Sequence, residues 1–242
     1  MARYLIVGGQ GGVGEAMARR LAGSGHQLVL TARSPENVEG LAGELGADSI
    51  GLDVLDDDHF ERLRAGAGDA LDGLVYAAGT ITLKPFDRLG EGDFLNDFRI
   101  NALGAAKVTQ ALLPALKAAP EGASVLLFST IAVDQGFAAH ASIAMAKGAV
   151  VGLVRSLAAE YAPQIRVNAI APSLLDTPLG RTVAGTPRMA EAVAGLHPIP
   201  RLGQPDDIAA AGELLLTGAG AWMTGQVIGI DGGRSRLRTS RS

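Results

Sequence analysis

The residues with the clearest chemical meaning lie near the start of the chain, in a glycine-rich segment from Gly8 to Gly14. Gly8, Gly12 and Gly14 follow a short apolar run and come directly before an amphipathic stretch. Glycine lets the backbone turn tightly, approach a phosphate closely and pack a helix against a strand. The first turn of the following helix offers N–H groups and a partial positive charge to a pyrophosphate. The segment therefore predicts a dinucleotide-binding loop.

A loop of this kind needs a strand before it and a helix after it, and short β-type runs alternate with longer amphipathic stretches throughout the chain. We expect strands at residues 3–7, 27–31, 49–52, 73–76, 124–128, 165–169 and 226–230. We expect helices at residues 12–22, 35–45, 57–65, 93–118, 141–161 and 205–216. Such alternation indicates βαβ units in an α/β, doubly wound Rossmann fold, whose seven-stranded parallel sheet is flanked by helices.

Composition limits the class of protein further. The 242 residues are 48% hydrophobic with a net charge of −4, which argues against a disordered chain and against a nucleic-acid partner. The absence of cysteine excludes disulfides, thiolate metal sites and a cysteine nucleophile, and we expect no metal site. No uninterrupted apolar run reaches the roughly 18 residues of a membrane span. We therefore expect one cytoplasmic domain over residues 1–242, without a membrane partner.

Two segments stand apart from the alternation. Residues 176–203 form a long irregular stretch rich in Pro and Gly, which is typical of a functional lid in a compact domain. The lid carries Arg181, Arg188 and His197, which either select an acidic or phosphorylated substrate or are simply exposed. Residues 234–242 form a basic tail with four arginines, of which Arg234 is the first, and we interpret it as a solvated or partly disordered terminus.

The glycine spacing is G-x-x-x-G-x-G, and further motifs follow it along the chain. They are Leu52-Asp53-Val54, Leu74-Val75-Tyr76-Ala77-Ala78-Gly79, Asn101, Lys147, Asn168-Ala169-Ile170-Ala171-Pro172, Thr224-Gly225-Gln226 and Asp231-Gly232-Gly233. Together they resemble the classical short-chain dehydrogenase/reductase family, close to its 3-oxoacyl-carrier-protein reductase-like members, over almost the whole chain to about Gly233. The resemblance implies a nicotinamide cofactor and hydride transfer to or from a small-molecule carbonyl or alcohol.

The resemblance also implies a catalytic set of Ser, Tyr, Lys and Asn, of which this chain keeps only part. Lys147 and Asn101 stand at matching positions, and Thr130 stands at the Ser position, where its hydroxyl can still donate a hydrogen bond. In the family, the Tyr gives or takes the proton at the substrate oxygen. Four residues before Lys147, however, the Tyr position holds Ile143, which has no ionisable group.

His140 is the strongest alternative proton donor in the sequence. It lies three residues before Ile143 and seven before Lys147, so a helix reaching that far would place all three on one face. If the helix begins later, His140 belongs to a loop at the mouth of the site, where an imidazole can still act as acid or base. A plain surface or cap role stays open for His140. Weaker alternatives are Ser142, Tyr76 and a water relayed through Lys147.

The choice of nicotinamide cofactor depends on the end of the second strand. NAD-selective proteins carry an acidic residue there, whereas this chain has Ala32 followed by Arg33. A small residue and a guanidinium suit a 2′-phosphate, so NADP(H) is favoured and NAD(H) remains possible.

The resemblance implies a set of cofactor-binding residues. They are Gly8, Gln10, Gly12, Val13, Gly14, Arg33, Asp53, Val54, Ala78, Gly79, Asn101, Lys147, Pro172 and Thr177. Three of them have alternative roles that need no cofactor: Arg33 as an exposed strand end, and Asp53 and Thr177 as helix caps.

The departures from the family pattern cluster at the nicotinamide end, where Ala77 replaces an Asn and Ser173 replaces a Gly, in addition to Ile143. We therefore expect an atypical NADP(H)-dependent oxidoreductase, with Thr130, Lys147, Asn101 and His140 as its catalytic residues. The alternatives are a non-catalytic nucleotide-binding homologue with a structural or regulatory role, and a lyase or isomerase that uses the bound cofactor. The resemblance further implies assembly into a homotetramer, or else a dimer.

Overall fold

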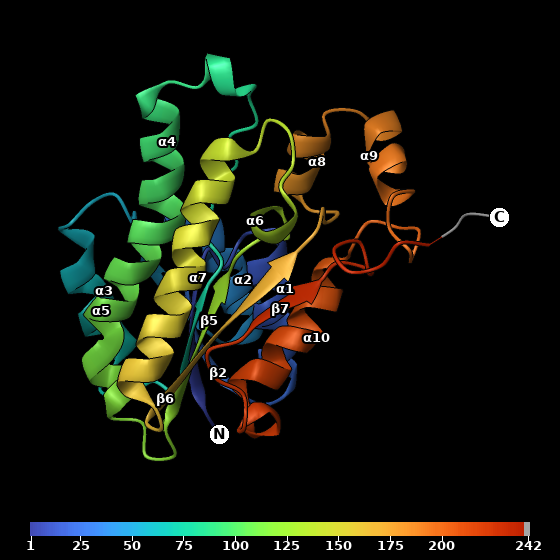
Figure 1. The fold of residues 1–242 in the computed structure, drawn as a ribbon. Helices are drawn as coiled ribbons and strands as arrows, with labels where there is room; N and C mark the ends of the chain where they lie inside the picture. Colours follow the sequence, from blue (N-terminus) through green and yellow to red (C-terminus); the bar gives the residue numbers. More distant parts are fainter. Residues whose placement is uncertain (240–242) are drawn as a thin grey trace.

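A parallel seven-stranded sheet forms the centre of the molecule, as Figure 1 shows. The computed structural model describes residues 1–239, and its strand order is β3-β2-β1-β4-β5-β6-β7. The strands are β1 (Arg3–Val7), β2 (Gln27–Ala32), β3 (Asp48–Gly51), β4 (Gly73–Tyr76), β5 (Ala123–Phe128), β6 (Ile165–Pro172) and β7 (Val227–Ile230). The expected α/β doubly wound fold is therefore confirmed, and the strand ends differ from expectation by at most three residues.

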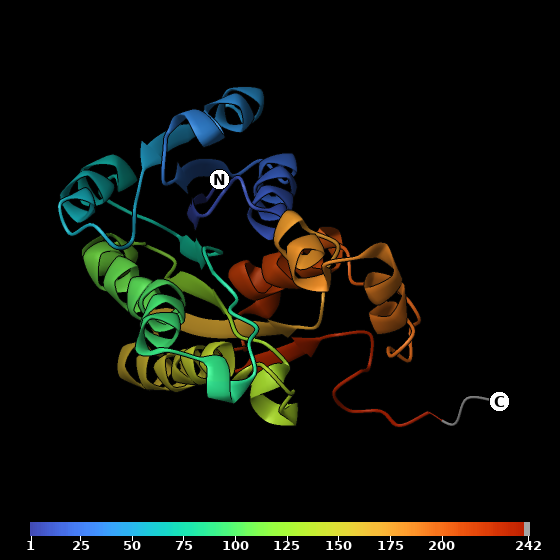
Figure 2. The same cartoon turned by 90° about the horizontal axis from the view of Figure 1, so that it is seen from above.

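Helices cover both faces of the sheet, and the view from above in Figure 2 shows the three layers. One face carries α1 (Gly12–Gly23), α2 (Glu36–Leu45) and α10 (Pro205–Leu216). The opposite face carries α3 (His59–Ala67), α5 (Gly104–Lys117) and α7 (Ala141–Tyr161).

Each face has its own core because successive strand residues point to opposite sides of a sheet. In β1, Leu5 and Val7 belong to the core beneath α5 and α7. Tyr4 and Ile6 belong to the core beneath α1 and α10. Both sides of the strand are therefore buried, which explains its continuous apolar sequence.

The expected single helix over residues 93–118 is wrong in one respect. The structure has α4 (Glu91–Phe98), then a π-helical turn η2 (Arg99–Leu103), and only then α5. The side chain of Asn101 donates to the Asp97 carbonyl at 2.9 Å, which is the acceptor that the Asn101 backbone would use in an α-helix. This competition for one carbonyl explains the wider turn, which places Asn101 inside the protein.

The stretch 176–203 is not irregular, contrary to expectation. It contains α8 (Pro178–Ala184) and α9 (Pro187–Ala194). Thr177 and Thr186 cap these helices by accepting hydrogen bonds from the amides of Gly180 and Met189, and a proline follows each threonine. Both helices lie together above the carboxyl edge of the sheet in Figure 1, where a lid would lie.

One helix, α7, is long and apolar enough to cross a membrane by length and composition. In this fold, however, it packs on β5 and β6 and buries Val150, Val154 and Ala158 in the core beneath it. It is therefore the core helix of a folded domain. A further short helix, α6 (Ala132–Gln135), lies between β5 and α7.

The chain crosses from β3 at one edge back to β4 beside β1, so the strand order reverses at β1. In open α/β sheets, ligands bind at this switch point, beyond the carboxyl ends of the strands.

Candidate functional site

The glycine-rich loop connects β1 to α1 at this switch point. The amides of Gly8 and Gly9 both donate to the Thr31 carbonyl at 3.0 Å, which fixes the loop beside β2. Gly8 has a φ of +80°, and a side chain there would lie 2.9 Å from the Ala78 amide nitrogen. A side chain on Gly14 would overlap the Gly8 carbonyl. Because its glycine positions carry no side chains, the loop leaves the first turn of α1, with its unpaired N–H groups, open to a phosphate.

A cleft of about 610 Å³ extends from this loop along the carboxyl ends of β2 and β4. The predicted cofactor residues that line it are Gly8, Gln10, Gly12, Val13, Gly14, Arg33, Asp53, Val54, Ala78, Gly79 and Thr177. Asn101, Lys147 and Pro172 lie outside this lining. The structure therefore brings most of the predicted set together around one elongated cleft.

At the far end of the cleft, Ala32 is buried and Arg33 is exposed. Within residues 1–239, no carboxylate lies within 4 Å of the Arg33 guanidinium, so its charge is available to a ligand. The residue at the end of β2, next to Arg33, is Ala32 and not an acidic residue. A carboxylate at this position would accept a hydrogen bond from the ribose 2′-hydroxyl of NAD.

Of the two residues with an alternative role as a helix cap, Asp53 and Thr177, only Thr177 caps a helix in the structure. Asp53 does not cap α3, because that helix begins after Asp58, and its carboxylate instead accepts from the Leu55 amide at 2.9 Å in a local turn. Thr177 does cap α8, accepting from Gly180 at 2.9 Å. The Thr177 side chain also packs against the loop, since a methyl group on Gly12 would lie 2.7 Å from its Cγ2.

The predicted catalytic pair Asn101 and Lys147 meets the cleft at Gly79. A methyl group on Gly79 would lie 2.8 Å from Asn101 Oδ1 and 3.8 Å from Lys147 Nζ. The Asn101 amide nitrogen donates to the carbonyls of Thr80 and Asp97, at 3.1 and 2.9 Å. Its Oδ1 is buried and finds no donor within residues 1–239. An unpaired buried acceptor is unfavourable, so this oxygen fits a polar group bound beside Gly79.

Lys147 reaches the end of β5 from α7. Its Nζ donates to the Phe128 carbonyl at 2.9 Å. Although the residue as a whole is only partly buried, desolvation of the ammonium lowers the pKa of Lys147 to about 8, and the nearby Asp97 carboxylate opposes this shift. Lys147 can therefore exchange a proton close to neutral pH, which an ordinary lysine cannot do.

The hydroxyl position next to Lys147 belongs to Thr130. Thr130 is partly exposed and its Oγ1 accepts from the Ala132 amide at 3.3 Å, which leaves its hydroxyl hydrogen for another acceptor. Ser129 is buried and donates to the Lys147 carbonyl at 3.3 Å, so it is already engaged. Ile143 is 3% exposed and is one of the buried residues of α7.

His140 lies immediately before α7, which begins at Ala141. It therefore does not stack on the helix face with Ile143, and it belongs to the loop that precedes α7. Its Nδ1 lies 2.7 Å from the Ala138 carbonyl and so carries a hydrogen, which leaves Nε2 for another partner. The ring also makes an edge contact with Phe137, with centroids 5.4 Å apart.

A buried carboxylate that the sequence analysis did not single out lies behind this site. Asp97 is fully buried and accepts from Thr80 Oγ1 at 2.9 Å, the Thr82 amide at 3.2 Å and Ser142 Oγ at 2.7 Å. Ser142 is thus turned toward α4 and is not a proton donor to substrate. The signal available in the sequence was an acidic residue four positions, or about one helical turn, before Asn101.

The tyrosines do not replace the missing one. The Tyr76 hydroxyl donates to the Ile100 carbonyl at 2.5 Å, and burial raises the pKa of the phenol, so Tyr76 packs in the wall. Tyr4 lies near the amino-terminal end of β1, and Tyr161 lies at the far end of α7.

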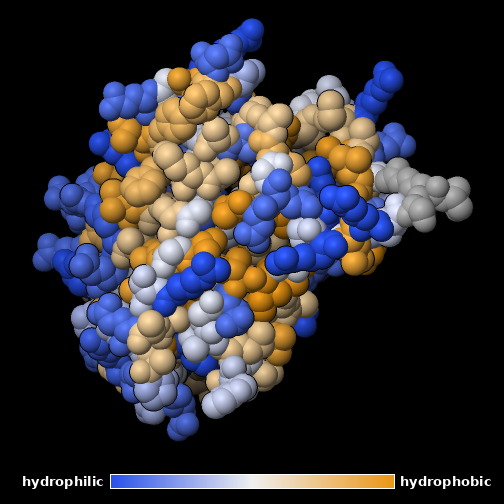
Figure 3. Space-filling view, viewed as in Figure 1, coloured by the Kyte–Doolittle hydropathy of each residue, from blue (hydrophilic) through white to orange (hydrophobic). Residues whose placement is uncertain are grey.

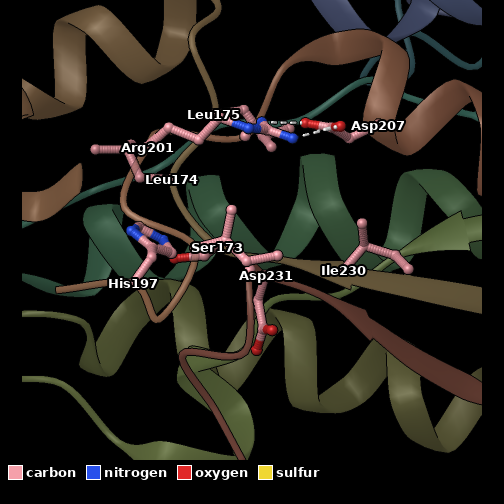
Figure 4. A pocket seen from close by; sticks show the side chains of 11 residues that line it. Ser173, Leu174, Leu175, His197, Arg201, Asp207, Ile230 and Asp231 are labelled. Atoms are coloured by element: carbon pink, nitrogen blue, oxygen red, sulfur yellow. Dashed lines mark hydrogen bonds and ion pairs between the residues drawn. The ribbon is translucent and has the colours of Figure 1, made fainter. Parts of the chain in front are cut away.

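A second cavity of about 220 Å³ lies beneath the lid, and Figure 4 shows its side chains. Ser173 and His197 point toward each other, with 2.9 Å between Oγ and Nε2. His197 Nδ1 lies 3.3 Å from the Ala194 carbonyl and carries the hydrogen, so the Ser173 hydroxyl donates to Nε2. The Asp231 carboxylate points away from both side chains, so the three do not form a catalytic triad (Figure 4).

A family model described as enoyl-(acyl carrier protein) reductase matches residues 7–235. D-threitol dehydrogenase from Mycolicibacterium smegmatis is 33% identical over 245 residues, covering 95% of this chain and 91% of that protein. The chain belongs to the short-chain dehydrogenase/reductase family. A protein named inactive 2-(S)-hydroxypropyl-CoM dehydrogenase 2, from Xanthobacter autotrophicus, is 33% identical over 91% of this chain and 100% of its own length. The solved structure of actinorhodin polyketide ketoreductase with NADPH superposes with a TM-score of 0.91 at 25% identity, covering 98% of each chain.

Membership assigns the cleft of this short-chain dehydrogenase/reductase to a nicotinamide cofactor, in agreement with its glycine loop and its unpaired Asn101 oxygen. Sequence reasoning missed several lining residues, among them Leu55, Thr80, Ile100 and Leu179. Leu55 and Leu179 are large apolar side chains in segments that follow a strand, and they stay 52% and 43% exposed. Leu55 comes three residues after an expected strand end, which was the signal that could have found it, whereas Leu179 lies in α8 and had no such signal.

Proposed function

We propose that this short-chain dehydrogenase/reductase is an NADP(H)-dependent oxidoreductase that interconverts a carbonyl and an alcohol without the family's tyrosine. The observation that carries the proposal is the junction at Gly79, where Asn101 and Lys147 lie together beside the cofactor cleft. A protein that had lost all chemistry would have no need for a desolvated ammonium and an unpaired buried amide oxygen there.

The cofactor, when bound, supplies or accepts a hydride. The glycine loop would hold its pyrophosphate, Asp53 and Val54 would hold its adenine, and Arg33 would bind a 2′-phosphate. Gly79, Asn101 and Lys147 would bind at its nicotinamide end, together with Thr177 and Pro172.

The chain's own residues would handle the substrate oxygen. The Thr130 hydroxyl donates a hydrogen bond to that oxygen, and Asn101 holds a polar group between itself and Lys147. Lys147 Nζ supplies the proton through a water, because its lowered pKa lets it release one near neutral pH. His140 Nε2, at the mouth, is the second proton source. Since general acid–base catalysis contributes about 10²–10⁴-fold, turnover without the tyrosine is slow rather than abolished.

A second candidate function is a non-catalytic nucleotide-binding protein with a structural or regulatory role. One specific observation favours it: the position of the proton donor is occupied by a buried apolar side chain, Ile143. Binding without turnover over a broad panel of ketones and alcohols would support this alternative.

The experiment that tests the cofactor assignment is a calorimetric titration with NADPH and then with NADH. We expect micromolar binding with NADPH preferred. The variant Arg33→Ala should weaken NADPH binding by roughly ten- to hundredfold and leave NADH binding unchanged, because only the 2′-phosphate contact is lost. The matched control is Arg62→Ala, which removes an exposed arginine on α3 that does not line the cleft.

Three outcomes are informative. Tight NADH binding with weak NADPH binding would overturn the choice of NADP(H) and keep the enzyme. An equal loss of both cofactors in the Arg33 variant would show that Arg33 does not read the 2′-phosphate. Failure to bind either cofactor would overturn the oxidoreductase and its nucleotide-binding alternative, and would leave a non-catalytic protein whose glycine loop no longer binds a dinucleotide.

We also propose that the protein works in the cytoplasm as a homotetramer. The proposal rests on the family resemblance and on apolar side chains that remain exposed on α4, η2 and α7, namely Leu95, Phe98, Leu103 and Met145. Sedimentation of the purified protein measures the assembly directly.

A further inference from the structure

The first arginine of the predicted basic tail is not solvated in the way the sequence indicated. Arg234 is partly buried, and its guanidinium lies over the Phe137 ring, 4.9 Å from the ring centre. Its Nη1 donates to Ser173 Oγ at 3.2 Å. The solvated interpretation therefore fails for Arg234. Arg236 and Arg238 are exposed, and Arg241 lies outside the described residues.

The backbone around Arg234 is held in place by two neighbours. Gln135 Nε2 donates to the carbonyls of Arg234 and Ser235, both at 3.1 Å. The Asp231 carboxylate accepts from the amides of Gly233 and Ser235, at 2.8 and 2.9 Å. Arg234 is therefore a positioned side chain on a fixed turn.

This position adjoins the substrate end of the site. The Ile131 amide, next to Thr130, donates to the Pro172 carbonyl at 3.2 Å, and Ser173 follows Pro172. Phe137, beneath the guanidinium, touches the His140 ring. The loop with His140, the end of β6 and the C-terminal segment therefore enclose one region next to the predicted catalytic hydroxyl.

The charge of Arg234 lacks a close partner. Within residues 1–239, no carboxylate oxygen lies within 4 Å of its guanidinium. Asp231 acts on it from farther away, and its carboxylate is already occupied by backbone amides. Arg201, which lines the second cavity, forms a two-pronged ion pair with Asp207 and is not available. A partly desolvated guanidinium without an ion pair is stabilised by a bound anion.

We propose that Arg234 binds an anionic group of the substrate, so that the proposed oxidoreductase acts on carbonyl or hydroxy compounds that carry a carboxylate. This inference rests on the proposed function for the reacting end of the substrate. A single guanidinium, with Asp231 nearby, suits one negative charge rather than a phosphate dianion. Ser173, which stands where the family has glycine, supplies the oxygen that orients the guanidinium.

The test compares matched ligands by calorimetry, with and without saturating NADPH. The probes are oxo-carboxylic acids with none to three methylene groups between the carbonyl and the carboxylate, each paired with its uncharged methyl ester. For at least one spacing we expect the acid to bind roughly ten- to hundredfold more tightly than its ester, as a charged hydrogen bond to Arg234 would give. Equal binding of acid and ester at every spacing would overturn the proposal.

Variants assign the preference to Arg234. Arg234→Gln should abolish the preference for the acid and leave ester binding unchanged, whereas Arg234→Lys should retain part of it because the charge remains. Ser173→Gly should reduce the preference several-fold. The control Arg236→Gln removes an exposed arginine two residues away and should change nothing. An Arg234→Gln protein that folds and keeps the full preference would contradict the assignment.

Binding and turnover separate the two proposals. A preference for the acid that depends on Arg234, in a protein that does not reduce any of the probes, would keep the anion site and overturn the oxidoreductase. Reduction of the esters as efficiently as the acids would do the reverse.

Discussion

Ile143 is the residue that most changes what this site can do. It is buried in the first turn of α7, one turn before Lys147. The loop that ends at His140 comes directly before this turn. An isoleucine can fill the space near the nicotinamide end but cannot donate a proton. Because the chain retains Thr130, Asn101 and Lys147, we propose that the site lacks one functional group and not its framework.

The variant Ile143→Tyr should therefore create or raise reductase activity toward simple ketones. A positioned phenol contributes up to about 10²–10⁴-fold as a general acid, so we expect a gain of at least tenfold in kcat with NADPH. The larger ring should lower the free energy of unfolding by about 1–3 kcal/mol because the site is well packed. Initial rates and thermal unfolding measure both effects.

Ile143→Phe is the matched control for that variant, because it adds the ring without the hydroxyl. It should show the same loss of stability and no gain in rate. A folded Tyr variant that binds NADPH normally but gains no activity would mean that more than the proton donor is missing.

The lowered pKa of Lys147 predicts the pH dependence of reduction. The ammonium holds its proton below about pH 8 and loses it above that pH. If Lys147 is the proton source, kcat/KM for reduction should be flat below about pH 8 and fall tenfold per pH unit above it. The free energy of unfolding should change in the opposite direction. Between about pH 8 and the ordinary lysine pKa, Lys147 is neutral in the folded protein but still protonated in the unfolded chain. The free energy of unfolding should therefore rise with pH in this range.

His140→Ala provides the comparison for the pH profile. It should leave the fall above about pH 8 unchanged and reduce the rate at most moderately. Disappearance of that fall in the His140 variant would transfer the role of proton source from Lys147 to His140.

At the scale of elements, the site depends on two local distortions of otherwise regular structure. The glycine loop brings α1 close enough to β1 and β4 that Gly14 overlaps the Gly8 carbonyl if a side chain is added. The π-helical turn η2 moves Asn101 inward, so that its amide reaches Thr80 and its oxygen lies beside Gly79. Both distortions put polar backbone or side-chain groups at the cleft.

Glycine substitutions should therefore have opposite effects in two helices. Gly14→Ala should destabilise the protein by about 1–3 kcal/mol and abolish NADPH binding, since the obstructing atom is backbone and cannot move aside. Gly43→Ala, at an exposed position of α2 with open space around it, should stabilise by about 0.5–1 kcal/mol and leave binding unchanged. Urea denaturation and NADPH titration measure both quantities. A Gly14→Ala protein with normal cofactor affinity would disprove the role assigned to the loop.

At the scale of the whole molecule, apolar residues gather near the middle of the face shown in Figure 3, over α7 and its surroundings. Met145 on α7 is 51% exposed, and Leu95 and Phe98 on α4 are 41% and 37% exposed. Apolar surface of this kind on packed helices favours self-association through close helix contacts. It is the region through which we expect the tetramer to form.

The variant Met145→Glu should therefore shift the protein to a smaller assembly, because a carboxylate at the centre of an apolar contact would lose its hydration. Gly43→Glu places the same charge on α2 and should leave the assembly unchanged. Sedimentation velocity distinguishes the species. An unchanged sedimentation coefficient for Met145→Glu would exclude this face of α7 from the interface.

The sequence by itself determined the α/β fold, the strand positions to within a few residues, and the glycine loop. Each of these depends on local patterns: strand periodicity, glycine spacing, and the order of strands and helices. The absence of tyrosine at position 143 is likewise visible in the sequence, because the spacing to Lys147 defines it. The two helices of the lid were missed although Thr-Pro pairs mark both of their starts.

Only the tertiary structure decided which polar groups meet. The Gly79, Asn101 and Lys147 junction joins three separate segments, and Arg234 reaches Ser173 and Phe137 across more than sixty residues. Likewise, the lowered pKa of Lys147 depends on how the chain buries it. Such contacts arise from the packing of distant elements, and sequence periodicity carries no information about them because it reports only on neighbours along the chain.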